Sequence, residues 1–274
     1  MIFIDRPLAR QLEMCHAWRC IHYSRAQAKL HPECGVRIET TCGGQAIFAG
    51  MDSPLNRVVG MGFDRPVNLD DLECVEAFYS SKNIIPRVDI CPMADASLFD
   101  TLRQKNYSIE AFQNVLIFPL SQIQNFQMPS GIEVRLSNPE EANLYILTTA
   151  QGFEGVEVPS QEALNLLAPN FYAENAACFF AWVDGDPAGG GGMYSHEGIV
   201  ELGGASTRPT YRRRGVQTAL VHTRIKAAQE NGNRFAMVVT EPASHSQRNL
   251  ERIGFRLAYT KAIMTKAPLN KESP

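Results

Sequence analysis

The stretch Tyr211-Arg212-Arg213-Arg214-Gly215-Val216-Gln217-Thr218-Ala219-Leu220 decides the fold of this chain. It follows an apolar run at 198–205 and opens a helical pattern at 217–230, so it joins a strand to the start of a helix. The first N–H groups of a helix lack internal partners, and the helix dipole favours negative charge there. Gly215 permits close approach of a ligand because it has no side chain. The arginines and this join together predict a site for a phosphate or pyrophosphate.

Two common phosphate loops do not fit this stretch. No Lys-Ser or Lys-Thr pair follows Gly215, so the stretch is not a P-loop. Only one glycine lies in the loop, which excludes a dinucleotide-binding fingerprint. A basic helix start that is merely solvated stays open as the alternative, since short motifs produce false positives.

The composition describes a globular protein with a substantial core. The chain has 274 residues, 45% hydrophobic and 20% charged, enough for one large domain or two of ordinary size. Its net charge of −3 argues against a nucleic-acid partner. We expect no membrane span, because no run of 18 apolar residues occurs, and no signal peptide, because residues 1–7 lack its apolar region.

The cysteines favour a reducing compartment. There are seven, an odd number scattered along the chain, which is typical of free thiols in the cytoplasm. Five residues near the start of the chain raise the question of zinc: Cys15, His16, Cys20, His22 and Cys34. No C-x2-C pair occurs among them, and residues 8–30 have a helical pattern. We therefore expect buried thiols and no metal.

The second half of the chain alternates strands and helices in a clear order. Predicted strands lie at 131–136, 178–183, 188–194, 198–205, 235–240 and 255–265, and predicted helices begin at Asn138 and cover 217–230 and 244–252. Asp184-Gly185 marks the turn between the second and third strands. For the four glycines at 189–192 we expect a strand that another backbone approaches closely, or a bulge.

The end of the first half has a similar layout. Predicted strands lie at 58–63, 87–91 and 112–118, and predicted helices at 69–81 and 96–105. Asn106-Tyr107 aligns with Gly254-Phe255, since Asn is the second choice where Gly ends a helix. We interpret this as a diverged internal repeat. Two unrelated αβ domains with a chance similarity are the alternative.

The two copies differ at the arginine loop. From Gly62 to Ile90 is 28 residues, whereas the matching span from Gly204 to Val239 is 35, and the extra residues fall in that loop. The first half therefore lacks the phosphate site. Residues 121–130 are polar and bounded by prolines, as in a linker. The predicted organisation is a first domain at 1–120, a linker at 121–130 and a second domain at 131–274.

Residues 131–266 resemble the GCN5-related N-acetyltransferases (GNAT). The family's pyrophosphate loop is usually written R/Q-x-x-G-x-G/A; Arg212 and Gly215 fit it, whereas Gln217 replaces the last small residue. The order of elements is similar to the family's, as is the helix–Gly-Phe–strand element around Phe255. The resemblance implies an α/β (α+β) fold of two GNAT-like domains, each a mixed, mostly antiparallel sheet flanked by helices. The first domain is then a degenerate copy.

The resemblance also implies acetyl-CoA as co-substrate and no metal. Its pantetheine arm is expected to pair with exposed backbone between the strands at 198–205 and 235–240. Its pyrophosphate is expected on N–H groups at the helix start, with charge-assisted bonds from arginine. The expected cofactor-binding residues are Ala205, Ser206, Thr207, Arg212, Arg213, Arg214, Gly215, Val216, Gln217 and Thr218.

The acceptor needs a base, because an amine like that of lysine has a pKa of about 10.4 and is protonated at neutral pH. Glu201 is the candidate, eleven residues before Arg212 on the preceding strand. Alternation places it opposite Val200 and Leu202, toward the cleft. A glutamate that faces solvent is the alternative, and His196 is a second candidate base.

The acid that protonates the leaving thiolate is less clearly marked. Many GNAT members carry a tyrosine four residues before the Gly-Phe glycine, and here Leu250 takes that place. Ser246, one turn earlier, is the predicted substitute, with Tyr259 as the alternative. A thiol pKa of about 8.5 also makes CoA a fair leaving group without help.

The predicted function is N-acetyl transfer from acetyl-CoA to a primary amine by direct attack in a ternary complex. The acceptor is a small molecule or a peptide, and the segment 151–175 with the first domain is expected to shape its cleft. A non-catalytic acyl-CoA-binding regulatory module is the main alternative, and a nucleotide-binding domain a weaker one. The sequence predicts a cytoplasmic protein without nucleic-acid or membrane partners and leaves open whether it forms a homodimer.

Overall fold

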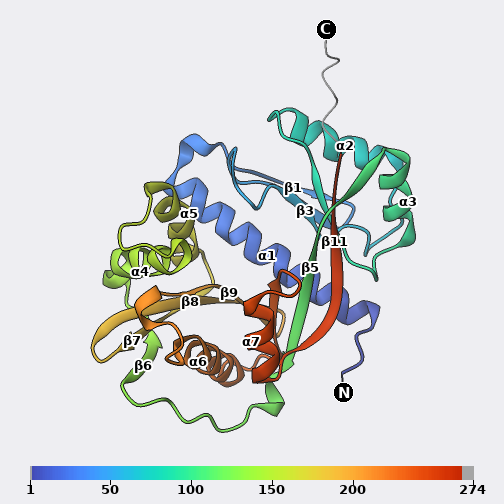
Figure 1. The fold of residues 1–274 in the computed structure, drawn as a ribbon. Coiled ribbons are helices and arrows are strands. Elements are labelled where there is room, and N and C mark those ends of the chain that lie inside the picture. The colour runs from blue at the N-terminus through green and yellow to red at the C-terminus, as the bar shows by residue number, and fades with distance from the viewer. Residues whose placement is uncertain (1, 267–274) are drawn as a thin grey trace.

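The computed structural model describes residues 2–266, and its centre is one mixed sheet of 11 strands (Figure 1). The strand order is β1-β2-β3-β4-β11-β5-β10-β9-β8-β7-β6. Within the described residues only β3–β4 and β9–β10 pair in parallel, so the predicted mixed, mostly antiparallel sheet is confirmed. The strands are β1 (Arg37–Thr41), β2 (Gly44–Phe48), β3 (Arg57–Val59), β4 (Arg87–Ile90), β5 (Tyr107–Pro119), β6 (Ile132–Leu136), β7 (Ala176–Val183), β8 (Asp186–His196), β9 (Ile199–Thr207), β10 (Phe235–Thr240) and β11 (Arg256–Lys266).

Helices cover both faces of this sheet. They are α1 (Arg6–Leu30), α2 (Leu69–Ser80), α3 (Ala96–Gln104), α4 (Ala142–Glu154), α5 (Gln161–Tyr172), α6 (Val216–Glu230) and α7 (His245–Ile253). Alternation along β7 shows how the second half forms its layers. Phe179, Ala181 and Val183 pack in the cluster that holds α6, whereas Cys178 and Phe180 pack in the cluster that holds α4 and α5.

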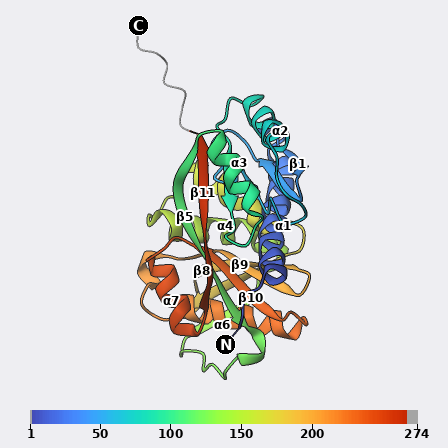
Figure 2. The same cartoon turned by 90° about the vertical axis from the view of Figure 1, so that its right-hand side faces the viewer.

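The two halves exchange their last strands. β11, from the end of the chain, lies between β4 and β5, whereas β5, from the first half, lies between β11 and β10. Figure 2 shows these two long strands running side by side through the molecule. The predicted pair of domain sheets is therefore joined into one. The domain boundaries at 120 and 131 stay a proposal about the chain, because each half completes its sheet with a strand of the other.

The long helix α1 also joins the halves. Asp5 caps its start, with the carboxylate accepting the Leu8 N–H at 2.9 Å. Ala9, Leu12 and Cys15 are fully buried against residues of the central strands β5, β9, β10 and β11. Figure 1 shows α1 crossing from the first half toward α5 of the second. This helix therefore covers one face of the central strands, where the two halves meet.

Most predicted elements lie within a few residues of their expected bounds. The strand expected at 58–63 is only Arg57–Val59, and β1, β2 and α5 were not predicted. The glycine run at 189–192 lies in β8, as expected: a Cβ at Gly190 would lie 2.5 Å from Tyr145, and the pairing with β9 shifts register there. Residue 1 and the end of the predicted second domain, 267–274, lie outside the described residues.

Candidate active site

The strands β9 and β10 part in the middle of the second half. Their parallel pairing ends at Met237 and Glu201, although β9 continues to Thr207 and β10 to Thr240. One edge of β9 beyond Glu201 therefore has backbone groups that β10 does not pair within the described residues. A cavity of about 840 Å³ opens along this edge, and we call it the loop cavity.

The arginine loop and the start of α6 form one wall of the loop cavity. Gly215 adopts φ 93° and is the N-cap of α6, so no side chain caps this helix start. Arg213 also has a positive φ, 63°, which is uncommon for a residue with a side chain. The N–H groups that open α6 thus face a cavity with a basic wall. Such a wall fits a phosphate-bearing ligand.

The loop cavity brings together nearly all the residues predicted to hold acetyl-CoA, together with the predicted acid. Those that line it are Ala205, Ser206, Thr207, Arg212, Arg213, Gly215, Val216, Gln217, Thr218 and Ser246. Arg214 differs from the expectation, because its guanidinium donates to Asp184 at 2.8 Å and the residue is not among those lining the cavity.

Two side chains of this wall form hydrogen bonds within the protein. Arg212 donates to the carbonyl oxygens of Gly152, at 2.8 Å, and Thr207, at 3.2 Å, so it ties the end of α4 to the end of β9. Gln217 accepts a hydrogen bond from Asn249 of α7 at 2.8 Å. Asn249 also lines the cavity and was not among the predicted site residues.

A second cavity, of about 640 Å³, lies between α1, α5 and β9, and we call it the helix cavity. Its walls come from both halves of the chain: Tyr23 and Leu55 from the first, Leu166 and Asn170 from the second. Phe153 lines both cavities, and Gly204 of the helix cavity is adjacent to Ala205 of the loop cavity. The two cavities are therefore neighbours at the point where β9 leaves β10, and we call this point the junction.

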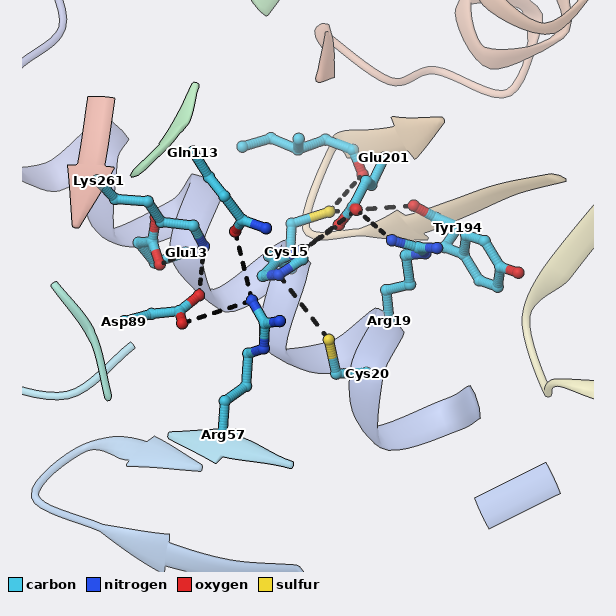
Figure 3. A network of polar contacts seen from close by, with 12 residues as sticks. Glu13, Cys15, Arg19, Cys20, Arg57, Asp89, Gln113, Tyr194, Glu201 and Lys261 are labelled. Atoms are coloured by element: carbon cyan, nitrogen blue, oxygen red, sulfur yellow. Dashed lines mark hydrogen bonds and ion pairs between the residues drawn. The ribbon is translucent and has the colours of Figure 1, made fainter. Parts of the chain in front are cut away.

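Glu201 lies close to this junction, but its setting differs from the expectation. It points to the face opposite Val200 and Leu202, as predicted, yet α1 covers that face and leaves Glu201 only 1% exposed. Its carboxylate contacts His16 Nδ1 at 3.0 Å and Arg19 Nη1 at 2.8 Å (Figure 3). The expectation of a carboxylate open to a cleft was wrong, because sequence alternation cannot show which helix packs on a strand.

The two cations control the protonation of Glu201. Burial alone raises the pKa of this carboxyl, but the charges of His16 and Arg19 outweigh it and lower the pKa to about 2. Burial and Lys261 lower the pKa of His16, whereas Glu201 and Cys20 raise it, to a net value of about 9. Glu201 is thus a permanent anion at neutral pH and a poor direct base.

A second buried cluster lies on the first-half side of α1. Lys261 of β11 is fully buried and lies 2.9 Å from Asp89 of β4 and 3.5 Å from Glu13 of α1. Arg57 lies 3.6 Å from Asp89 and also donates to Gln113 at 3.4 Å (Figure 3). Two cations and two carboxylates balance in this cluster. It joins α1, β3, β4, β5 and β11 rather than forming a wall of either cavity.

The other sequence candidates lie elsewhere. Tyr259 donates to Glu13 at 2.7 Å, and the His196 ring packs on Trp18 with centroids 4.9 Å apart. Neither residue is among those that line the two cavities. The seven cysteines are free thiols, and within residues 2–266 no set of three or more His, Cys, Asp or Glu side chains could hold a metal ion. In the same range, no helix has both the length and the apolar character to span a bilayer.

Comparison with known proteins agrees with this geometry. Residues 142–255 match the family model described as the acetyltransferase (GNAT) family. The chain carries a GNAT domain. That domain holds the arginine loop, the β9–β10 splay and the second-half walls of both cavities. Acyl transfer from acetyl-CoA is the general chemistry of GNAT enzymes, and the comparison supports it for this chain at that level.

Solved structures show the same fold over most of the chain. A GCN5-related N-acetyltransferase from Kribbella flavida is 16% identical with a TM-score of 0.63, covering 90% of this chain and 96% of that chain. One from Sphaerobacter thermophilus is 16% identical with a TM-score of 0.57, covering 77% and 71%. A tandem GNAT protein from the clavulanic acid biosynthesis pathway is 10% identical with a TM-score of 0.57, covering 83% and 79%. A search of curated proteins gives no match.

Proposed function

We propose that this protein is an N-acetyltransferase that moves an acetyl group from acetyl-CoA to a primary amine by direct attack in a ternary complex. One observation carries the proposal: the loop cavity and the helix cavity share Phe153 and are lined by the adjacent residues Ala205 and Gly204, where β9 leaves β10. A thioester bound from one side and an amine bound from the other can meet at that junction. Direct transfer requires this proximity.

Acetyl-CoA occupies the loop cavity in this proposal. The pyrophosphate contacts the N–H groups of residues 216–218 and the side chain of Arg213, while the pantetheine arm runs along the free edge of β9 at 205–207. Arg212 shapes the wall by its bonds to Gly152 and Thr207. Ser246, at the start of α7, lines the same cavity and is the proposed proton donor to the leaving thiolate.

The acceptor amine occupies the helix cavity, which both halves of the chain build. Its apolar walls, which include Tyr23, Leu55 and Leu166, suit an amine with an apolar body. Glu201 belongs to the proton path of this proposal, but it acts through the groups that enclose it, because its carboxylate is covered. Arg19 connects it to the cavity, since Arg19 lines the cavity and contacts Glu201 at 2.8 Å.

Calorimetry with a matched pair of arginine variants tests the cofactor site. Arg213 lines the loop cavity, whereas its neighbour Arg214 is paired with Asp184 outside it. Loss of one charge-assisted hydrogen bond costs about 1.5–3 kcal/mol, so Arg213→Ala should raise the Kd for acetyl-CoA about tenfold or more. Arg214→Ala should leave it within about threefold. Absence of acetyl-CoA binding by the unaltered protein would refute the proposal.

A panel of amines separates the enzyme from its main rival. Thiol release from acetyl-CoA is followed with each amine in turn, and turnover above the rate of hydrolysis identifies an acceptor. A non-catalytic acyl-CoA-binding module should bind acetyl-CoA equally well and release no thiol with any amine. Amines with an apolar body should give the larger kcat/KM values if the helix cavity is the acceptor site.

A further inference from the structure

Cys20 lies at the floor of the helix cavity, next to a histidine and a carboxylate in line. Its sulfur lies 3.9 Å from His16 Nε2, and His16 Nδ1 lies 3.0 Å from Glu201. The two α1 residues are one helical turn apart, which places them on one face. Cys20 lines the cavity although only 1% of its surface is exposed. A thiol, an imidazole and a carboxylate in this order resemble the nucleophile–base–orienting group arrangement of activated cysteines.

The charges around Cys20 favour its thiolate. Glu201 carries one negative charge, and His16 and Arg19 are both cations at neutral pH, so these three side chains leave one positive charge in a buried site. A thiolate at Cys20 neutralises that charge. Burial by itself raises the pKa of the Cys20 thiol, but the charge and hydrogen bond of His16 outweigh burial, and the net shift is downward.

The groups that face this cluster come from every neighbouring element. α1 contributes His16, Arg19 and Tyr23, β9 contributes Glu201, and β8 contributes Tyr194; the paired charges of Lys261 of β11 and Asp89 of β4 act on His16 from the far side. Burial raises the pKa of Tyr23 and of Tyr194, so both phenols stay neutral. Cys20 is therefore the member of the cluster that lines the helix cavity and whose thiol pKa its cationic neighbours lower.

Cys15 on the same helix provides an internal contrast. Its sulfur lies 3.7 Å from the carbonyl oxygen of Ile199 and 3.9 Å from that of Tyr194, so it faces acceptors instead of a cation. Burial and the charge of Glu201 raise the pKa of the Cys15 thiol well above its ordinary value. Cys15 is also absent from the residues that line either cavity. Two buried thiols of one helix thus have opposite electrostatic settings.

We infer that Cys20 is the group that takes the proton from the acceptor amine, with His16 and Glu201 as the positioning residues that hold it as a thiolate. The inference rests on the proposed acetyl transfer. One proton passes from the ammonium to the Cys20 sulfur, which gives a neutral amine and a thiol. The amine nitrogen then bonds to the acetyl carbon, and the C–S bond of the thioester breaks. Ser246 gives its hydroxyl proton to the CoA sulfur and takes up the second amine proton in its place. The Cys20 thiol finally releases its proton to solvent.

Alkylation by iodoacetamide tests the thiolate without any acetyl transfer. Peptide mass spectrometry measures the adduct at each cysteine of the unaltered full chain between pH 6 and 9. Cys20 should react at least about tenfold faster than Cys15 at pH 7. The alkylation rate of Cys20 should reach its plateau at a pH below about 8.5, the ordinary thiol pKa. His16→Gln should lower the alkylation rate of Cys20 about tenfold at pH 7, and this rate should then rise with pH near 8.5. Circular dichroism is used to establish that the variant is folded. The inference is overturned if Cys20 is alkylated as slowly as Cys15, or if His16→Gln leaves the alkylation rate of Cys20 unchanged.

Kinetics with an amine from the panel test the proton transfer. A general base contributes about 10²–10⁴-fold, so Cys20→Ala should lower kcat about a hundredfold while the calorimetric Kd for acetyl-CoA stays the same. Cys20→Ser, which keeps the shape but replaces the thiol by a far less acidic hydroxyl, should shift the pH profile to higher pH. Cys15→Ala is the matched control and should keep its kcat. An unchanged pH profile in Cys20→Ser with full kcat rejects the inference and leaves the transferase proposal intact. Absent acetyl-CoA binding rejects the transferase proposal and, with it, the role of Cys20 in proton transfer.

Discussion

At the scale of single residues, the contact between Glu201 and its two cations makes the junction of the halves sensitive to pH. The folded pKa of Glu201, about 2, lies below the ordinary value of 4.5, so its contribution to stability is complete above 4.5 and lost as pH falls toward 2. The folded pKa of His16, about 9, lies above the ordinary 6.5, so its contribution is complete below 6.5 and lost as pH rises through 9. Both contributions are complete only between about pH 5 and 6.5.

Glu201→Gln should therefore destabilise the protein most in that window. The substitution leaves the buried His16 and the half-buried Arg19 without their anion, which costs about 3 kcal/mol or more in the free energy of unfolding. Urea unfolding at pH 3, 6 and 9.5 measures the difference from the unaltered protein, which should be largest at pH 6. Glu157→Gln is the control, because Glu157 is 76% exposed in its pair with Arg208 and should change stability by less than about 1 kcal/mol. A difference that stays constant across the three pH values would contradict this account.

Residue patterns alone predict part of this site. The arginine loop is recognisable because Arg212 and Gly215 keep a fixed spacing at a strand–helix join, and both line the loop cavity. The face of Glu201 follows from strand alternation. The contacts of Glu201 do not, because His16 and Arg19 lie 185 and 182 residues away in the chain and no local pattern links them. For the same reason the sequence predicts Cys20 only as a buried thiol.

At the scale of elements, local signals predict what each segment becomes but not its neighbours. β10 begins and ends where predicted, and α6 differs by one residue, since periodicity and flanking turn residues are local. α5 was not predicted, although Ser160 is a good N-cap, because Pro169 inside the helix argues against a helical assignment. The exchange of β5 and β11 could not be predicted, because two similar apolar strands carry no local mark of which partner each will pair with.

Removal of β11 should unfold both halves. β11 pairs with β4 on one edge and β5 on the other, and it buries Tyr259, Ile263 and Met264 as well as the charged Lys261. Burial of the three apolar side chains alone contributes about 5–9 kcal/mol, which is comparable to the whole stability of many domains. A chain that stops at Phe255 should therefore lose its cooperative urea transition. A chain that stops at Lys266 keeps β11 and is the control, and an unchanged transition in the shorter chain would show that the exchange contributes little.

At the scale of the whole molecule, the second half lines the loop cavity and the first half supplies part of the wall of the helix cavity. The first half also contributes α1, which covers Glu201 and lines the helix cavity through Arg19, Cys20 and Tyr23. Under the proposed function, the first half, which has no counterpart of the arginine loop, thus contributes to the site of the second half. The continuous sheet fixes this geometry, because β5 and β11 run from one half into the other.

This connection predicts that the molecule unfolds as one unit and that acetyl-CoA stabilises all of it. Two independent domains would melt separately, and a ligand of the second would shift only its own transition. Here differential scanning calorimetry should show a single transition, and acetyl-CoA at a hundred times its Kd should raise the free energy of unfolding by about 2.7 kcal/mol for one site per chain. Titration calorimetry should give the same stoichiometry, because residues 64–68 of the first half contain no counterpart of the arginine loop. Two resolved transitions, with only one of them moved by acetyl-CoA, would show that the halves fold independently despite their shared sheet.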